Sequence, residues 1–504
     1  MGFFKKNSLI FFGLGIIVLF FITRFYNLLG LPIFTDEAIY VRWAQIASND
    51  ANWRFISLTD GKQPMFVWIG MVLMKFISDP LLAGRTVSVI AGLFSTIGVF
   101  FLANEIFKNR KIGLLTSFVY VIYPFSLVYD RMALYDSLVA MFIIWSIYFE
   151  ILLARRIRLD IALILGMIIG GGMLTKTNAD FALLFLPFSL LFFDFRDKKR
   201  IKKLSLWIAY AFAACSIAFA MYSVLRLSPF LYIITEKNAL FVYPISEWIS
   251  HPFTYFFSNL SALINWLSIY MTLPFLVLVV SSFFVGKKFI KEKLFLLIVF
   301  IVPFIYLAFF GKNIYPRFIL FMTLPLLILG SYTFYNLISF VKKIFLKVII
   351  VIVFLATFVV NDYYIVTDFA NAMVPKSDKG QFILSWPSGV GVKETVSYLT
   401  EKSKTEKIYV ATQGTFGLMP FALEMYFVNN PNVIIKGFWP INKDIPTEVI
   451  EASKKMPTYF VFYQDCLDCV HAGMTPETWN KQTEIVFQIE RAEKERYYTL
   501  YQVK

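Results

Sequence analysis

The chain has 504 residues, of which 58% are hydrophobic and 16% are charged, and its mean hydropathy is +0.67. Soluble domains average about 45–50% apolar and about 25% charged residues, so this composition excludes a soluble enzyme or a disordered scaffold and indicates an integral membrane protein. The formal net charge of +15 is spread over short clusters between apolar segments, which is typical of cytoplasmic loops and not of a nucleic-acid-binding patch.

About eleven apolar segments have close to the ~20 residues that cross a bilayer. The first runs from Ser8 to Thr23, and we expect it to be retained as a helix because no small-residue cleavage site follows it. The other segments are centred near Ile90, Tyr120, Ile143, Met167, Leu186, Phe212, Leu278, Ile301, Leu326 and Phe354.

A basic cluster precedes the first segment at residues 5–6, and further clusters follow every second segment, at residues 108–111, 155–158, 196–203, 287–293 and 342–347. The positive-inside rule places all of them in the cytoplasm and the N-terminus with them. The opposite side receives residues 25–85, 227–259, 311–317 and everything after 361. We therefore expect a multi-pass protein of the plasma membrane with an extracytoplasmic C-terminus.

The tail changes composition, with Lys/Glu-rich stretches alternating with short β-branched runs. This pattern predicts a small α/β domain. The predicted domains are a transmembrane domain over residues 1–361, whose outer loop is 25–85, and a soluble extracytoplasmic domain over 362–504. In the tail, Cys466, Cys469 and His471 form a weak metal motif, and the two cysteines suit a local disulfide better.

Charges at the ends of apolar segments are costly, which makes them candidates for function. On this topology they share the outer side: Asp36, Glu37, Arg42, Lys62, Arg85, Asp130, Arg131, Asp136, Lys176, Asp180, Arg226 and Arg317. Each one singly could instead snorkel to the interface or pair locally. As a set they predict one polar cavity that opens to the outer leaflet.

The sequence lacks the motifs of several common enzyme classes, which excludes those classes as functions. The sequence has no G-x-x-x-x-G-K-[ST] or G-x-G-x-x-G motif, and its two histidines, His251 and His471, do not form H-E-x-x-H. An ATP-driven pump, a dinucleotide enzyme and a zinc protease are therefore not expected. A substrate that arrives within the membrane fits the outward-facing charges better.

Five short motifs follow one another along the chain: Phe34-Thr-Asp36-Glu37-Ala-Ile-Tyr40, Gly61-Lys62-Gln-Pro64-Met, Arg131-Met-Ala-Leu-Tyr-Asp136, Leu174-Thr-Lys176 and Tyr315-Pro-Arg317-Phe. In this order and topology they resemble the polytopic glycosyltransferases of the GT-C fold, close to the dolichyl-phosphate-mannose protein mannosyltransferases and the aminoarabinose transferases (glycosyltransferase family 39-like). The resemblance covers roughly residues 1–340. It departs at Ile39, where aminoarabinose transferases tend to carry arginine, and at Gln63, where proline is more usual.

The resemblance implies transfer of a sugar from undecaprenyl or dolichyl phosphate to a hydroxyl of a protein, lipid or glycan, with inversion and with no nucleic acid involved. Asp36 is the expected general base, and Glu37 would orient it or hold the acceptor. A phosphate leaving group needs cations, which predicts phosphate contacts from Lys62, Arg131, Lys176, Arg42 and Arg317. Asp130 and Asp136 would support the site, hold the acceptor or bind a divalent cation, although no spacing demands a metal.

Two other functions compete with this interpretation. A transporter or flippase for a lipid-linked glycan would place ionisable residues near the midplane and would often show repeated halves, neither of which is clear here. A non-catalytic anchor that displays the C-terminal domain leaves the shared side of the charges unexplained. The sequence identifies neither the sugar nor the acceptor.

Overall fold

The structure is a computed structural model that describes residues 8–441, 444–463, 479, 482–491 and 497–504. Its contacts divide the chain into two compact units. Unit 1 comprises Met1–Leu28, Ala51–Ile69 and Arg85–Pro375, and unit 2 comprises Leu29–Asp50, Gly70–Gly84 and Lys376–Lys504. The predicted motif at Cys466, Cys469 and His471 lies outside the described residues.

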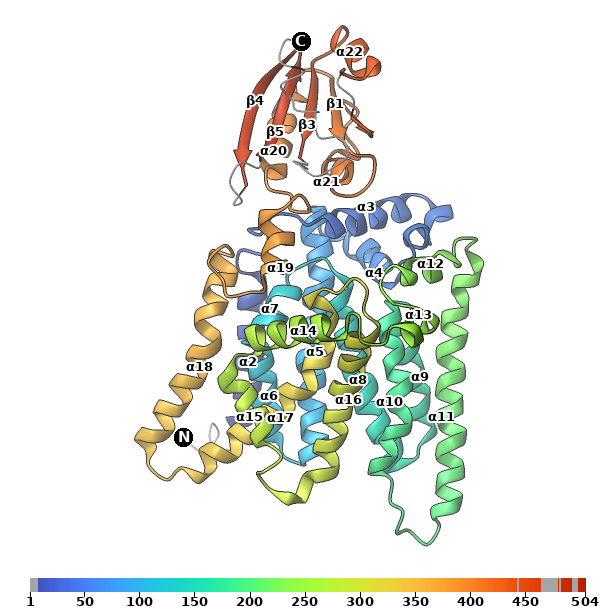
Figure 1. Cartoon of the computed structure of the whole chain (residues 1–504), viewed down its shortest axis with the longest axis vertical. Coiled ribbons are helices and arrows are strands. Elements are labelled where there is room, and N and C mark those ends of the chain that lie inside the picture. The colour runs from blue at the N-terminus through green and yellow to red at the C-terminus, as the bar shows by residue number, and fades with distance from the viewer. Residues whose placement is uncertain (1–7, 442–443, 464–478, 480–481, 492–496) are drawn as a thin grey trace. The chain divides into compact units, whose positions relative to one another are not determined.

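Unit 1 is helical (Figure 1). Most of its helices are strongly apolar. In chain order they are α2 (Ser8–Phe25), α6 (Arg110–Val121), α7 (Pro124–Tyr129), α8 (Tyr135–Arg156), α9 (Leu159–Met173), α10 (Phe181–Phe188), α11 (Arg200–Tyr222), α12 (Ile233–Ala239), α13 (Ile245–Ser250), α14 (Phe256–Met271), α15 (Leu273–Ser281), α16 (Ile290–Phe310), α17 (Leu320–Phe340) and α18 (Ile344–Thr367). The 3-10 turns η2 (Ile56–Asp60), η3 (Thr177–Asp180) and η7 (Pro316–Ile319) connect them, while α4 (Met65–Leu73) and α5 (Pro80–Phe107) run from one unit into the other.

Every predicted apolar segment coincides with a helix, but not every helix is long enough to cross a membrane by itself. Within the described residues, six helices pass on length and composition: Pro80–Phe107, Tyr135–Arg156, Arg200–Leu227, Ile290–Phe310, Pro316–Phe340 and Ile344–Thr367. The pair α14 and α15, bent by 98°, makes a seventh if it is one broken span. Other predicted spans are shorter apolar helices, among them Leu9–Phe25, Leu159–Met173 and Thr177–Phe192. The chain is thus a multi-pass membrane protein, and the full count of about eleven spans stays a prediction.

Helix α17 is the central helix of unit 1. In its most apolar 18-residue window, 89% of the residues are buried inside the protein. The corresponding share is 17% for α18 and 22% for α11. It packs against α6, α8, α15 and α16, so it has protein on all sides. A helix that is hydrophobic all round needs such an environment, whereas α18 and α11 leave apolar side chains for lipid.

Unit 2 contains the predicted C-terminal sheet, which confirms a small α/β domain (Figure 1). The strands are β1 (Ile408–Gln413), β2 (Val433–Phe438), β3 (Thr458–Phe462), β4 (Thr483–Glu490) and β5 (Tyr497–Val503), in the order β2-β1-β3-β5-β4. Strand β1 pairs in parallel with β2 and β3, and β5 pairs antiparallel to β3 and β4. The helices are α19 (Lys376–Lys379), α20 (Val392–Lys402), α21 (Leu418–Phe427) and α22 (Thr447–Ser453).

The first outer-loop motif folds with this sheet domain. Helix α3 (Thr35–Asn49) packs against α21, and the residues before it pair with the 385–389 segment. The Thr35 amide donates to the Pro387 carbonyl at 2.9 Å, and the Gly389 amide donates to the Ile33 carbonyl at 2.7 Å. These contacts do not decide whether residues 362–504 fold by themselves. The predicted domain boundary at residue 361 therefore stays a prediction.

Candidate functional site

The Gly61-Lys62-Gln-Pro64-Met motif lies in unit 1 and begins in a turn that requires glycine. Turn η2 ends at Gly61, whose φ is +66°. A Cβ at this position would lie 2.6 Å from the Lys237 Cβ and 2.7 Å from the Ile233 carbonyl oxygen, so only glycine fits both the backbone angle and the space. The chain then turns back, and the Lys62 amide donates to the Ser57 carbonyl at 2.9 Å.

Two hydrogen bonds join this segment to the turn that carries Lys176. The Met65 amide donates to the Leu174 carbonyl at 3.0 Å, and the Gln63 Nε2 donates to the Thr177 Oγ1 at 3.0 Å. Gln63 is the position where the motif departs from the family pattern, and here its amide links two predicted motifs. Lys62 and Lys176 are thereby brought to neighbouring positions.

The two lysines lie over two aromatic rings that touch each other. The Lys62 Nζ is 5.5 Å from the centre of the Phe241 ring, and the Lys176 Nζ is 4.7 Å from the centre of the Phe318 ring. The ring centres are 6.0 Å apart in an edge-to-face arrangement. We call these four residues, together with Asp136, the lysine cluster.

Asp136 supplies the carboxylate of the lysine cluster. It lies in the first turn of α8, and its Oδ1 accepts from the Lys176 Nζ at 2.8 Å. The Lys176 ammonium thus lies against this carboxylate, and the Lys62 ammonium adds a second positive group to the cluster. The aromatic faces attract the ammonium groups without neutralising them, so the cluster can bind an anion such as a phosphate.

Glycines on α9 allow the close helix packing that precedes Lys176. A Cβ on Gly170 would lie 2.8 Å from the Met221 sulfur on α11, and one on Gly171 would lie 2.5 Å from the Phe142 ring on α8. The absence of side chains therefore allows α8, α9 and α11 to pack closely. Lys176 follows directly after this close packing.

Arg317 lies beside the cluster, because it precedes Phe318 in turn η7. Its guanidinium carbon is 5.2 Å from the centre of the Tyr315 ring. Predicted phosphate contacts from three separate motifs, Lys62, Lys176 and Arg317, are thus associated with one set of aromatic side chains in unit 1.

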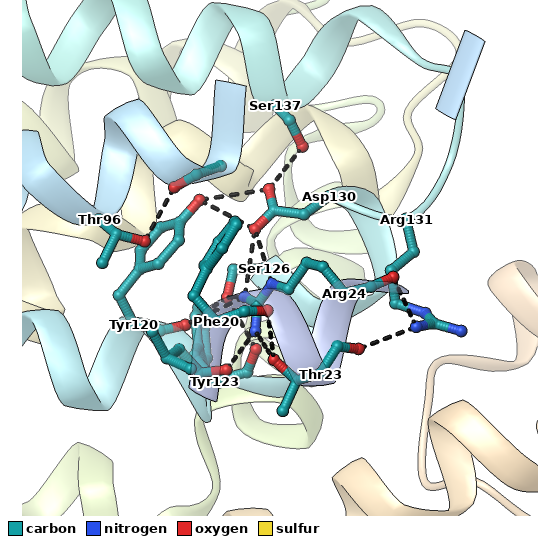
Figure 2. A network of polar contacts seen from close by, with 12 residues as sticks. Phe20, Thr23, Arg24, Thr96, Tyr120, Tyr123, Ser126, Asp130, Arg131 and Ser137 are labelled. Carbon is teal, nitrogen blue, oxygen red and sulfur yellow. Dashed lines mark hydrogen bonds and ion pairs between the residues drawn. The ribbon is translucent and has the colours of Figure 1, made fainter. Parts of the chain in front are cut away.

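Asp130 belongs to a different network in the same unit (Figure 2). Its Oδ2 accepts from the Arg24 Nη2 at 3.1 Å, and both side chains are fully buried. The Oδ1 accepts from the Ser137 hydroxyl at 2.9 Å, and the Tyr120 hydroxyl is 3.3 Å from each carboxylate oxygen. Sequence reasoning missed Arg24, and the available signal was a lone arginine at the end of the first apolar segment.

Asp130 lies in the turn between α7 and α8, outside the helices that are long enough to span a membrane. Burial raises the pKa of this carboxyl to about 6, although the Arg24 guanidinium opposes the rise. Asp130 is therefore poised to take up a proton if its arginine is lost.

Arg131 points away from Asp130 and holds the end of α2 (Figure 2). Its guanidinium donates to the carbonyl oxygens of Thr23, Arg24, Tyr26 and Asn27 at 2.7–2.9 Å. The last carbonyls of a helix have no partner within the helix, and a cation suits the negative end of the helix dipole. This geometry gives Arg131 a positioning role, and its phosphate contact stays a prediction.

The predicted residues on α3 belong to unit 2 and differ in their surroundings. Glu37 is fully buried, and its Oε2 accepts from the Phe34 amide at 2.9 Å, so it caps the start of the helix. Asp36 precedes it in the same first turn and is only partly buried. Arg42 pairs with Glu424 of α21 at 2.8 Å, so its predicted phosphate contact stays a prediction.

Residues 61–224 match the family model described as dolichyl-phosphate-mannose-protein mannosyltransferase, and this stretch includes Lys62, Asp136 and Lys176. No curated protein matches the chain. The match confirms the resemblance inferred from the motifs.

Two solved proteins share the fold. ArnT from Cupriavidus metallidurans, bound to undecaprenyl phosphate, is 12% identical with a TM-score of 0.60, and the match covers 99% of this chain and 98% of that one. Its apo state gives 13% identity and a TM-score of 0.58 over the same shares. The oligosaccharyltransferase AglB from Archaeoglobus fulgidus, in complex with an inhibitory peptide and a dolichol-phosphate, is 12% identical with a TM-score of 0.52, covering 91% of this chain and 69% of that one. The chain has the GT-C fold, and the family match together with this fold indicates a glycosyltransferase.

Proposed function

We propose that this protein transfers a sugar from a polyprenyl-phosphate donor to an acceptor hydroxyl on the extracytoplasmic face of the plasma membrane, with inversion at the anomeric carbon. The observation that carries the proposal is the lysine cluster, where two ammonium groups and one carboxylate gather against the Phe241 and Phe318 rings. Such a site suits a phosphate headgroup that stays attached to an apolar chain.

The leaving group explains the need for cations. When the bond between the anomeric carbon and the phosphate oxygen breaks, the phosphate gains negative charge, and fixed cations stabilise that charge without having to deliver a proton. We assign this task to Lys62 and Lys176, with Arg317 beside them. ArnT and AglB were solved with undecaprenyl phosphate and dolichol-phosphate, which supports a donor of this class.

The acceptor hydroxyl has to lose a proton as it attacks, and a positioned carboxylate can take that proton. We propose Asp36 as this general base, since the neighbouring Glu37 is engaged as a helix cap. Direct displacement by one nucleophile inverts the anomeric carbon, unlike the two-step route of retaining enzymes. Within the described residues, no group of three or more His, Cys, Asp or Glu side chains is arranged to hold a metal ion. The proposed steps use no metal ion.

The experiment measures donor binding and transfer separately on the purified full-length protein. We expect mass spectrometry to find a polyprenyl-phosphate sugar with the wild type and to find it reduced at least tenfold with Lys62→Ala/Lys176→Ala. Asp36→Asn should retain the lipid and lose transfer of radiolabelled sugar by about a hundredfold or more, the scale of lost general-base catalysis.

Lys404→Gln is the matched control, because it removes an exposed lysine that pairs only locally with Glu401. It should leave both measurements unchanged. Equal lipid recovery from the wild type and the double variant would overturn the phosphate assignment, and full transfer by Asp36→Asn would overturn the assignment of the base.

A further inference from the structure

Unit 2 has a cavity that neither the motifs nor the lysine cluster explains. Its volume is about 630 Å³, and it is lined by the C-terminal end of α3, by residues 74–80 and by the end of α21 with the residues after it. We call it the α3–α21 cavity. Ligand sites typically have volumes of about 300–1,000 Å³, so it has room for a small organic group such as one or two sugar rings.

Uncharged polar side chains are frequent in the lining of the α3–α21 cavity. Amide and hydroxyl groups come from Gln45, Ser48, Asn49, Ser78, Asn429 and Asn430. Tyr426 adds an aromatic ring with a hydroxyl group. Amides both donate and accept hydrogen bonds, so a set of them can bind neighbouring hydroxyl groups, while the Tyr426 ring offers an apolar surface to carbon-bound hydrogens.

The charges of the lining argue against an anionic ligand. The lining residues that the structure describes include no lysine or arginine, and their one ionisable acid is Asp79. Asp79 Oδ1 already accepts from the Leu82 amide at 2.7 Å. Helices α3 and α21 both end at the cavity, and C-terminal helix ends carry partial negative charge. Helix α5 begins at the cavity with Pro80, but its positive N-terminal end is already capped by Asp79. A phosphate or carboxylate would therefore be disfavoured, whereas a hydroxyl donor would be favoured.

Gln45 shows where such a donor is needed. Its Nε2 donates to the Met425 carbonyl at 2.8 Å, and a carbonyl can only accept, so this bond fixes the orientation of the amide. The Gln45 Oε1 is buried and has no hydrogen-bond partner among the described residues. A buried acceptor without a donor is costly, so a ligand whose binding turns this oxygen toward a hydroxyl donor gains a hydrogen bond that the described residues do not supply.

We propose that the α3–α21 cavity binds an uncharged sugar residue of the acceptor. The identification as acceptor rests on the proposed function, while the sugar-binding site itself rests on the lining. A peptide would be the other macromolecular ligand. The lining is made of helix ends and a loop and presents no strand edge, so it lacks the row of backbone groups that binds an extended peptide.

The experiment measures binding of methyl glycosides of neutral hexoses and N-acetylhexosamines to the full-length protein by saturation-transfer NMR. We expect at least one glycoside to bind saturably to the wild type. Gln45→Leu should weaken its binding three- to tenfold, the value of one neutral hydrogen bond. Asn429→Ala, at an exposed position of the lining, should weaken it similarly without affecting the fold.

Glu424→Gln is the matched control, because it breaks the Arg42 ion pair between α3 and α21 outside the cavity. It should leave glycoside binding unchanged. The proposal is overturned if no glycoside binds, or if both lining variants bind the glycoside as tightly as the wild type does. It is also overturned if an unglycosylated peptide, and not a glycoside, occupies the cavity.

The two proposals fail separately. Lipid recovery with Lys62→Ala/Lys176→Ala tests the donor site alone, and glycoside binding needs neither donor nor transfer. Glycoside binding that depends on Gln45 supports the cavity even if no donor lipid is found. Donor recovery without glycoside binding rejects the cavity and leaves the donor site standing.

Discussion

Arg24 and Asp130 are opposite charges buried together, and each responds differently to loss of its partner. Arginine stays protonated at any relevant pH, so Arg24 without Asp130 is an uncompensated buried cation. The Asp130 carboxyl, whose pKa burial raises to about 6, can take up a proton and become neutral. The cost of breaking this pair therefore depends on which partner is removed.

We predict that Asp130→Leu destabilises the protein more than Arg24→Leu. The first substitution should cost about 3–5 kcal/mol, the scale of an unpaired buried charge, and the double variant should recover part of that loss. Thermal unfolding in detergent at pH 7 measures all three. Equal losses from the two single variants would contradict this prediction and would indicate that the Tyr120 and Val121 carbonyls, to which Arg24 also donates, stabilise the buried cation without Asp130.

At the scale of elements, the close packing of α9 on α11 determines where the Lys176 turn lies. A Cβ on Gly166 would lie 2.7 Å from the Ala214 carbonyl oxygen and 2.8 Å from the Ile217 Cβ. Backbone atoms cannot move aside as a flexible side chain can. The two helices would therefore have to separate to admit even one methyl group.

We predict that Gly166→Ala costs about 1–3 kcal/mol, the range for overpacking, and lowers the recovery of donor lipid. Gly15→Ala in α2 is the matched control, because a Cβ there has nothing within 4 Å. It should be neutral or slightly stabilising, since alanine favours helix over glycine. Melting temperature and lipid recovery report both effects, and a neutral Gly166→Ala would mean that α9 and α11 adjust freely.

At the scale of the whole molecule, unit 2 is assembled from three separate stretches of the chain. Helix α3 packs on α21, and the Phe34 ring packs edge-to-face on Phe382 with ring centres 5.2 Å apart. The general base proposed at Asp36 is thus carried by a helix whose partners lie more than three hundred residues later. The C-terminal domain is in this sense part of the support of the first outer-loop motif.

We predict that truncation after residue 375 leaves α3 without its packing partners. Limited proteolysis should then cleave within residues 29–50, which should be protected in the full-length protein. Protection of this stretch in the truncated protein would show that α3 is stable without the sheet domain. That result would favour the sequence-based boundary at residue 361.

The sequence by itself determined the membrane class, the positions of the apolar helices, the α/β character of the tail and the motifs that resemble GT-C glycosyltransferases. These features follow from composition and local periodicity, which a single stretch of chain contains. Only the tertiary structure decided the partners: Lys176 with Asp136, Arg42 with Glu424, and Arg24 with Asp130, which lie 106 residues apart. A buried charge has to be paired by whatever the packing of distant helices brings to it, and local sequence does not contain that information.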